Sequence, residues 1–307
     1  MNRVKEFSEW VLDRLDDYLP GELGQITGQI VDVGKNNGTV KTGIVLQIPD
    51  CSVSPVIYLD GLLKKIDEGM EKEKALLGLS EIIEEAVEAG REFKDRKFQM
   101  DLENYDVTKK MLAVRLINTE DNREMLKNIP HSNIEDLSVI PVLNVNASYD
   151  MGVDGQIRIE NKTLELWGKT EEEVLKDAIQ NAEKTAPYVI KGLPAYTGEP
   201  PVFYILTNTE MIYGASVISY PGVLDEVAQK IGEAYYLLPS SVHEMLIIEK
   251  SRGIPPEALG GMVREVNSTE VRPEEVLSDR IYEYDPERKR LRQIPESMEK
   301  VKKDMER

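Results

Sequence analysis

The amino-acid sequence predicts an α+β fold: antiparallel sheets with helices packed on their faces, in two loosely divided sub-domains. Three observations lead to this prediction. Segments rich in β-branched residues follow one another across short turns, which is typical of antiparallel strands. Other segments carry apolar residues at helical spacing. The 307 residues, of which 41% are hydrophobic, are enough to build one large or two ordinary domains.

Residues 1–150 are predicted to form the N-terminal α+β sub-domain. Its first part reads as a helix, a two-stranded hairpin, a third strand and a helical stretch interrupted near Gly69, at residues 4–18, 25–33, 40–48, 54–59 and 62–89. The hairpin turn at Gly34–Gly38 contains asparagines and glycines, which tolerate a positive φ. An α-β-β-β-α-α order follows.

The middle of the chain continues this pattern. A strand, a short helix and a pair of extended segments are predicted at 111–118, 122–129, 137–147 and 155–160. The last two pair across Asp154-Gly155, a strong hairpin signal. Thr170 and Glu173 form a capping box, so a helix with an apolar face begins there and ends by Pro187.

Residues 151–285 are predicted to form the C-terminal α+β sub-domain, which contains two strand–strand–helix units. Residues 191–201, rich in glycine and proline, are the most linker-like part of the chain. The two units lie at 202–206, 215–220 and 223–231, and at 235–238, 244–248 and 256–266. Pro221 is expected at the first helical position of the first unit. The last strand is predicted at 280–284.

The charge of the chain is unevenly distributed. Acidic residues number 56 and basic residues 38, a net charge of −18. Residues 286–307 form a charged basic tail of net +3, which leaves −21 on the preceding 285 residues. This tail is either a solvated helix, which we favour, or a segment that docks on the acidic body or on an acidic partner. An acidic surface repels phosphates, so no direct contact with nucleic acid is expected.

Known phosphate and metal motifs are not matched. Gly28 and Gly34 are separated by five residues instead of four, and Asn36 replaces the Ser or Thr of a phosphate-binding loop. Two histidines and one cysteine are too few for an ordinary zinc site. The run 150–157 reads as a hairpin turn instead of a calcium loop, because Gly152 occupies a ligand position. We therefore expect no cofactor and no metal.

The expected location is the cytoplasm. Cys51 has no partner for an internal disulfide, and the first residues form a charged amphipathic pattern instead of an apolar signal core. Apolar runs are far shorter than the roughly 20 residues that cross a bilayer. We therefore expect no membrane association. Cys51 follows Pro49-Asp50 in a predicted loop without a neighbouring cation, and it is expected to be unreactive.

The most suggestive chemical motif is Ser240, Ser241, His243 and Glu244. It places two hydroxyls, an imidazole and a carboxylate in five residues, and nucleophilic catalysis uses these groups. Ser241 and His243 would share a face of an extended segment, whereas catalytic triads usually assemble from distant parts of a chain. The favoured interpretation is a polar turn in which the serines bond to local backbone. Asn208 and Ser216 are two candidate ligand-binding residues, which would line a pocket together with this cluster.

Several segments taken together resemble one bacterial family. They are Ser54-Pro-Val-Ile-Tyr-Leu-Asp60, Arg115-Leu-Ile-Asn118, Leu164-Glu-Leu-Trp-Gly168, Tyr213-Gly-Ala-Ser216, Leu237-Leu-Pro-Ser-Ser-Val-His-Glu244 and Val263-Arg-Glu-Val-Asn267. The chain resembles domain of unknown function family 5688, which occurs in anaerobic Gram-positive bacteria and their mobile elements. The resemblance implies one co-occurring unit up to Tyr284. It implies no activity, cofactor or catalytic residue.

Three hypotheses of function follow. The first is a non-enzymatic interaction or accessory protein with an unknown protein partner. The second is a small-molecule or hydrolytic enzyme that uses the Ser240, Ser241, His243 and Glu244 cluster. The third is an acidic mimic of nucleic acid that binds a basic protein, which the charge of −21 motivates.

Overall fold

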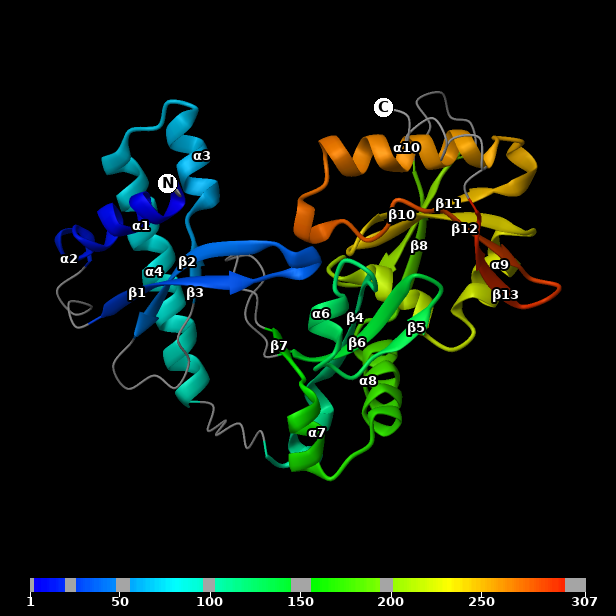
Figure 1. Ribbon diagram of the computed structural model, residues 1–307, viewed down its shortest axis with the longest axis horizontal. Coiled ribbons are helices and arrows are strands. Elements are labelled where there is room, and N and C mark those ends of the chain that lie inside the picture. The colour runs from blue at the N-terminus through cyan, green and yellow to red at the C-terminus, as the bar shows by residue number, and fades with distance from the viewer. Residues whose placement is uncertain are drawn as a thin grey trace. The chain divides into compact units, whose positions relative to one another are not determined.

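The computed structural model describes residues 3–19, 26–47, 56–95, 103–144, 156–193 and 201–295. Its described strands form three antiparallel sheets with helices against them, so the predicted α+β class is confirmed (Figure 1). The chain divides into two compact units. The first contains Met1–Lys35, Thr39–Leu102 and Val145–Gln156, and the second contains Asn36–Gly38, Glu103–Asn144 and Ile157–Arg307.

The first unit has the predicted three strands followed by two helices, but its single predicted opening helix is divided in two, so that its described helices and strands run α-α-β-β-β-α-α. Its elements are α1 (Arg3–Leu12), α2 (Leu15–Tyr18), β1 (Thr27–Gly34), β2 (Val40–Gln47), β3 (Val56–Tyr58), α3 (Asp60–Asp67) and α4 (Lys72–Asp95). The sheet order is β1-β2-β3, and the hairpin register runs from Thr27 opposite Gln47 to Gly34 opposite Val40. Gly69, with a φ of 108°, separates α3 from α4.

The core of the first unit forms where the helices meet the sheet. Apolar side chains of α1 and α4 recur at helical spacing and are buried with those of β2, and they include Phe7, Val11, Ile44, Leu46, Leu76, Leu79 and Ile83. Gly43 on β2 is required by close packing, because an added Cβ would lie 2.9 Å from the Ile57 carbonyl oxygen of β3.

A four-stranded sheet lies in the second unit. Its strands are β4 (Leu112–Asn118), β5 (Ser132–Ile134), β6 (Leu137–Asn144) and β7 (Gln156–Arg158), with the order β4-β6-β5 and β7 paired to β6. Nearby helices are α5 (Tyr105–Thr108), the 3₁₀ helix η3 (Lys109–Met111), α6 (Arg123–Leu126), α7 (Asn161–Trp167) and α8 (Glu171–Thr185). α8 packs on β4 and β6, and the predicted capping box at Thr170 and Glu173 is present at its start (Figure 1).

A six-stranded sheet also lies in the second unit. Its strands are β8 (Tyr188–Gly192), β9 (Tyr204–Asn208), β10 (Tyr235–Ser241), β11 (Glu244–Glu249), β12 (Tyr282–Asp285) and β13 (Arg290–Gln293), in the order β13-β12-β10-β11-β9-β8. The helical segments are η5 (Gly214–Ser219), α9 (Val223–Ile231), η6 (Lys250–Arg252), α10 (Pro256–Thr269) and η7 (Pro273–Glu275). Leu259 and Val263 of α10 are buried against Tyr236, Leu238 and Ile248 of the sheet.

One predicted strand is wrong, and with it the first strand–strand–helix unit. Residues 215–220 form no strand, because Gly214–Ser219 is a 3₁₀ helix. The hydroxyls of Ser216 and Ser219 donate to the carbonyls of Tyr213 and Ser216, at 2.8 and 2.6 Å, and so reinforce turns of three residues. Pro221 also precedes the helix instead of starting it, since α9 begins at Val223 after Gly222.

Three further features differ from what the sequence predicts. β10 continues through the predicted turn at 239–241 with a bulge, so the chain reverses at Val242 and His243. β13 was not predicted; it places four residues of the segment treated as a basic tail in the sheet beside β12. Residues 103–144, assigned by sequence to the N-terminal sub-domain, group with the C-terminal half in the compact units.

Candidate functional site

The β10–β11 hairpin positions the predicted cluster. Ser241 lies opposite Glu244 in the register, directly after the bulge. The Ser240 hydroxyl donates to Oε1 of Glu244 at 3.2 Å, and the Ser241 hydroxyl oxygen accepts the backbone N–H of His243 at 3.1 Å. Both serine side chains therefore bond within the hairpin.

The His243 imidazole contacts two segments outside the hairpin. Its Nδ1 accepts the backbone N–H of Tyr213 at 3.2 Å, and its ring stacks on the Tyr213 ring with centroids 5.3 Å apart. Its Nε2 lies 3.6 Å from Oε1 of Glu275 on η7. The His243 side chain is 31% exposed. The acceptor role of Nδ1 places the proton of the neutral ring on Nε2, toward the carboxylate.

Charged groups surround this contact. The Arg115 guanidinium of β4 lies 3.7 Å from the centroid of the Tyr213 ring, a cation–π geometry. Glu275 also lies 3.5 Å from Arg272. Tyr213 itself has a φ of 52°, in the left-handed region that non-glycine residues seldom adopt. Four segments of the second unit thus meet at the Tyr213–His243 pair.

The two candidate ligand-binding residues are buried beside the same turn. Asn208 is 6% exposed and its amide donates to the Ile212 carbonyl at 3.0 Å, while its Oδ1 is buried without a hydrogen-bond partner. Ser216, 1% exposed, donates to the Tyr213 carbonyl. An added Cβ on Gly214 would lie 2.6 Å from the Asn208 nitrogen and 2.7 Å from the His243 oxygen. The turn is therefore tightly packed.

Sequence reasoning found His243 but missed the residues that its ring contacts. The hydroxyl of Ser241 bonds to the backbone of His243, and the ring nitrogens face Tyr213 and Glu275. Neither contact residue carries a local motif, since both come from other segments of the chain. The signal in the sequence for an unusual backbone conformation at Tyr213 was the glycine that follows it, Gly214.

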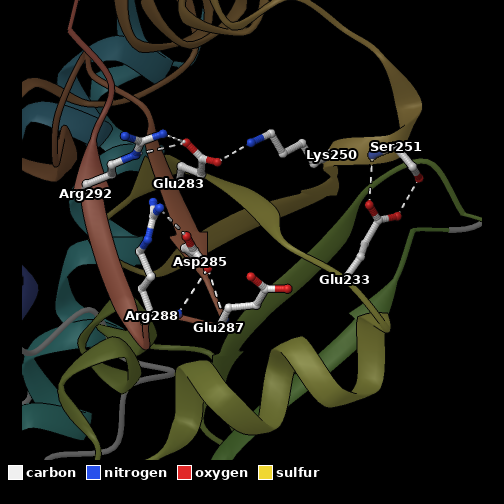
Figure 2. A network of polar contacts seen from close by, with 8 residues as sticks. All are labelled: Glu233, Lys250, Ser251, Glu283, Asp285, Glu287, Arg288 and Arg292. Atoms are coloured by element: carbon white, nitrogen blue, oxygen red, sulfur yellow. Dashed lines mark hydrogen bonds and ion pairs between the residues drawn. The ribbon is translucent and has the colours of Figure 1, made fainter.

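A second polar network, also missed by sequence, surrounds Glu283 of β12 (Figure 2). The Glu283 carboxylate is 6% exposed and accepts hydrogen bonds from Lys250 and from Arg292, whose Nη2 lies 2.6 Å away. Burial by itself raises the pKa of this carboxyl, but the bonds from Lys250 and Arg292 outweigh burial, so the pKa lies below its ordinary value.

Three cations of the segment predicted as a basic tail pair with acidic residues of the second unit. Arg292 bonds to Glu283, Arg288 lies 3.5 Å from Asp285, and Lys289 lies 3.2 Å from Asp225. Figure 2 shows the first two of these pairs beside the Asp285 turn, whose carboxylate also accepts the backbone N–H of Glu287 at 3.0 Å. This part of the segment docks on the acidic body.

The described part of the chain shows neither a metal-binding cluster nor a membrane-spanning helix. No group of three or more His, Cys, Asp or Glu side chains there is arranged to hold a metal ion. No described helix is long and apolar enough to span a bilayer. Nδ1 of the other histidine, His131, lies 2.9 Å from the Ile129 carbonyl oxygen. Cys51 and the predicted turn at 150–155 lie outside the described residues.

The described strands, in three antiparallel sheets, and the helices packed against them define an α+β protein. Residues 4–286 match the model of a family of unknown function, DUF5688. The chain belongs to this family, as its sequence segments predicted. No curated protein and no solved structure matches the chain.

Proposed function

We propose that this chain is a non-enzymatic interaction or accessory protein of the bacterial cytoplasm, with a protein partner. The observation that carries the proposal is that the side chains of the most suggestive catalytic motif, Ser240 to Glu244, make hydrogen bonds that hold the local structure. Ser240 and Ser241 bond within the β10–β11 hairpin, and His243 bonds to the backbone of Tyr213. These contacts give each of the three side chains a structural role.

The chemistry of serine nucleophiles supports this proposal. A catalytic serine must pass its proton to a nearby base, normally a ring nitrogen of histidine. Here Nδ1 of His243 is occupied by the Tyr213 N–H, and the Ser241 oxygen receives the His243 N–H. The single cysteine supports the cytoplasmic location, because disulfide bonds are typical of secreted proteins and one cysteine forms none within the chain.

Affinity capture tests the proposal. The full chain, tagged at its N-terminus, is recovered from its native host at low and at high salt, beside a tagged unrelated protein of similar size and net charge. We expect one protein in stoichiometric amount with this chain alone. A partner that is released by salt and competed by DNA would favour the nucleic-acid mimic instead. Recovery of no stoichiometric partner at low salt would contradict the proposal.

A hydrolytic enzyme is the second candidate, because one observation favours it. His243 and Glu275 form an imidazole–carboxylate pair at 3.6 Å, and such a carboxylate orients the histidine of a catalytic triad. The Ser241 hydroxyl is held beside this histidine by the His243 backbone N–H. In this candidate the carboxylate partner is Glu275, while Glu244 bonds to Ser240.

A fluorophosphonate probe separates the two candidates. The interaction protein is expected to show no labelling above that of the heat-denatured chain. The enzyme would be labelled, and Ser241→Ala or His243→Ala would abolish labelling while leaving the circular dichroism spectrum unchanged. Ser268→Ala is the matched control, since Ser268 is an exposed serine on α10. Labelling with this pattern would refute the non-enzymatic proposal.

A further inference from the structure

His243 lies where three segments of the second unit meet. The β10–β11 turn carries the ring, the residue before η5 supplies the N–H to its Nδ1, and η7 supplies the carboxylate near its Nε2. The two ring nitrogens therefore need opposite hydrogen-bonding roles. Nδ1 accepts a hydrogen bond from the Tyr213 N–H, and Nε2 faces the carboxylate of Glu275. Only a neutral imidazole with its proton on Nε2 satisfies both contacts.

We propose that His243 is a pH-sensitive latch on the turn at Tyr213 and Gly214. The neutral ring holds the turn through the bond from the Tyr213 N–H. The protonated ring releases the turn and is drawn to Glu275. Histidine is the side chain that ordinarily changes charge between about pH 5 and 8.

Protonation and the Tyr213 bond exclude each other. A proton on Nδ1 turns the acceptor into a donor that faces the Tyr213 N–H 3.2 Å away. The backbone N–H then loses its partner in a half-buried position, which is costly. Tyr213 has a φ of 52°, and such a conformation persists only where the surrounding contacts enforce it. Loss of the bond therefore favours a change at this residue.

The charges around the ring set the direction of the change. Glu275 faces Nε2 and attracts an imidazolium, although it also pairs with Arg272 at 3.5 Å. Arg115 lies over the Tyr213 ring at 3.7 Å and repels a second cation near that ring. Glu244, the remaining carboxylate of the hairpin end, is hydrogen-bonded by Ser240. A protonated ring thus gains by moving from Tyr213 toward η7.

The contacts of the turn show what the latch controls. The Ser216 hydroxyl bonds to the Tyr213 carbonyl, and the Thr207 hydroxyl bonds to the His243 carbonyl at 2.8 Å. Gly214 packs against the backbone of both Asn208 and His243. Release of the Tyr213 N–H is therefore expected to change the packing at the end of β9 and at the start of η5.

Nuclear magnetic resonance of the full chain tests the latch, and the presence of only two histidines makes the assignment simple. At pH 8 the ring ¹⁵N shifts of His243 should show the tautomer protonated on Nε2. Between pH 8 and 5 the Tyr213 amide shift should follow the midpoint of the His243 ring. The protection factor of that amide should fall at least ten-fold. His131→Gln, the matched control, should leave the transition unchanged.

Two variants give further outcomes. His243→Phe keeps an aromatic ring beside Tyr213 without an acceptor, so the Tyr213 amide should be unprotected at both pH values. Glu275→Gln removes the anion toward which the charged ring would move, so the Tyr213 amide should keep more of its protection at pH 5 than in the native chain. A tautomer protonated on Nδ1 at pH 8, or a Tyr213 amide that ignores the titration of His243, would overturn the proposal. Both readouts come from the unmodified chain, so a variant that fails to fold leaves the test intact.

Discussion

Glu283 is a buried acidic side chain that two cations keep ionised. Its carboxylate is 6% exposed and accepts bonds from Lys250 and from the guanidinium of Arg292 (Figure 2). An unpaired carboxylate in this position would be costly, because ionised groups lose much of their hydration on burial. The two cations compensate for that loss, and the pKa of Glu283 lies below its ordinary value as a result.

Glu283→Gln tests this balance at the scale of one residue. The neutral amide leaves both cations without their carboxylate, so we expect a loss of about 2 kcal/mol in the free energy of unfolding near pH 7. A lowered carboxyl pKa stabilises the fold above the unfolded value, about 4.3, and this contribution is lost as pH falls through the folded pKa. Urea unfolding of both proteins from pH 7 to 3 measures the difference.

The difference between the two proteins should therefore be constant near neutral pH and shrink below about pH 4. Glu287→Gln is the control, because it removes the same charge from an exposed side chain of the adjacent turn and should change stability by under about 0.5 kcal/mol. A loss that is equal in both variants, or independent of pH, would refute the role given to Glu283.

Sequence predicted the residues of the candidate site that lie in one hairpin, and could not predict the rest. Ser240, Ser241 and Glu244 are neighbours because two short strand ends must bring them together. Glu275 and Tyr213 reach His243 only through the packing of other segments. Residue spacing carries no information about such contacts, since local geometry relates only side chains a few positions apart.

At the scale of elements, α8 is a helix whose beginning is encoded locally. The Thr170 side chain accepts the Glu173 N–H at 3.2 Å, and the Glu173 carboxylate accepts the Thr170 N–H at 2.9 Å. These bonds satisfy donors that the first helical turn cannot pair. The buried residues Val174, Leu175, Ala178 and Ala182 then follow at helical spacing. This agreement between cap and periodicity explains why the helix was predicted.

Thr170→Ala should destabilise α8 at its first turn. We expect the free energy of unfolding to fall by about 1 kcal/mol, because the Glu173 N–H loses its side-chain acceptor. Thr170→Ser retains the hydroxyl, so its free energy of unfolding should fall by a smaller amount. Thermal unfolding of the three proteins, with hydrogen exchange of residues 171–175, gives the measurement. Equal stability of the alanine variant and the native chain would contradict the capping role.

Among the described elements that escaped prediction, including β5 and β8, η5 and β13 show how a local signal can be ambiguous. Gly214–Ser219 is short, apolar and almost fully buried, and such a run does not distinguish a strand from a buried helical turn. Arg290–Gln293 alternates exposed and half-buried residues, but its charges resemble a solvated tail. It becomes a strand because the backbone of β12 offers it a partner. In both cases the surrounding structure decides the conformation.

At the scale of the whole molecule, Asp136 connects the two sheets of the second unit. It lies in the turn between β5 and β6 and accepts the Tyr282 hydroxyl of β12 at 2.6 Å and the Ser278 hydroxyl at 2.9 Å. Tyr282 is 1% exposed, and burial together with the Asp136 carboxylate raises the pKa of its phenol. The buried bond ties the four-stranded sheet to the six-stranded sheet.

Tyr282→Phe should weaken both sheets together. Removing a hydroxyl that donates to a charged acceptor is expected to cost about 2 kcal/mol. Hydrogen exchange should increase in β6 as well as in β12, since the lost bond joins their segments. Tyr188→Phe is the control, because that hydroxyl donates to the exposed Glu226 at 2.6 Å and its loss should affect only β8 and α9. Increased exchange confined to β12 would refute a connecting role for Asp136.

The sequence by itself determined the α+β class, the β1–β2 hairpin, most helices and the cap of α8. Backbone preferences, turn residues and apolar periodicities act over a few neighbouring residues, so these features can be predicted from the sequence. Only the tertiary structure decided that β10 lies between β11 and β12, and that His243 meets Tyr213 and Glu275. Contacts between distant segments depend on how the whole unit packs, because the free energy that selects them comes from burial shared among many residues.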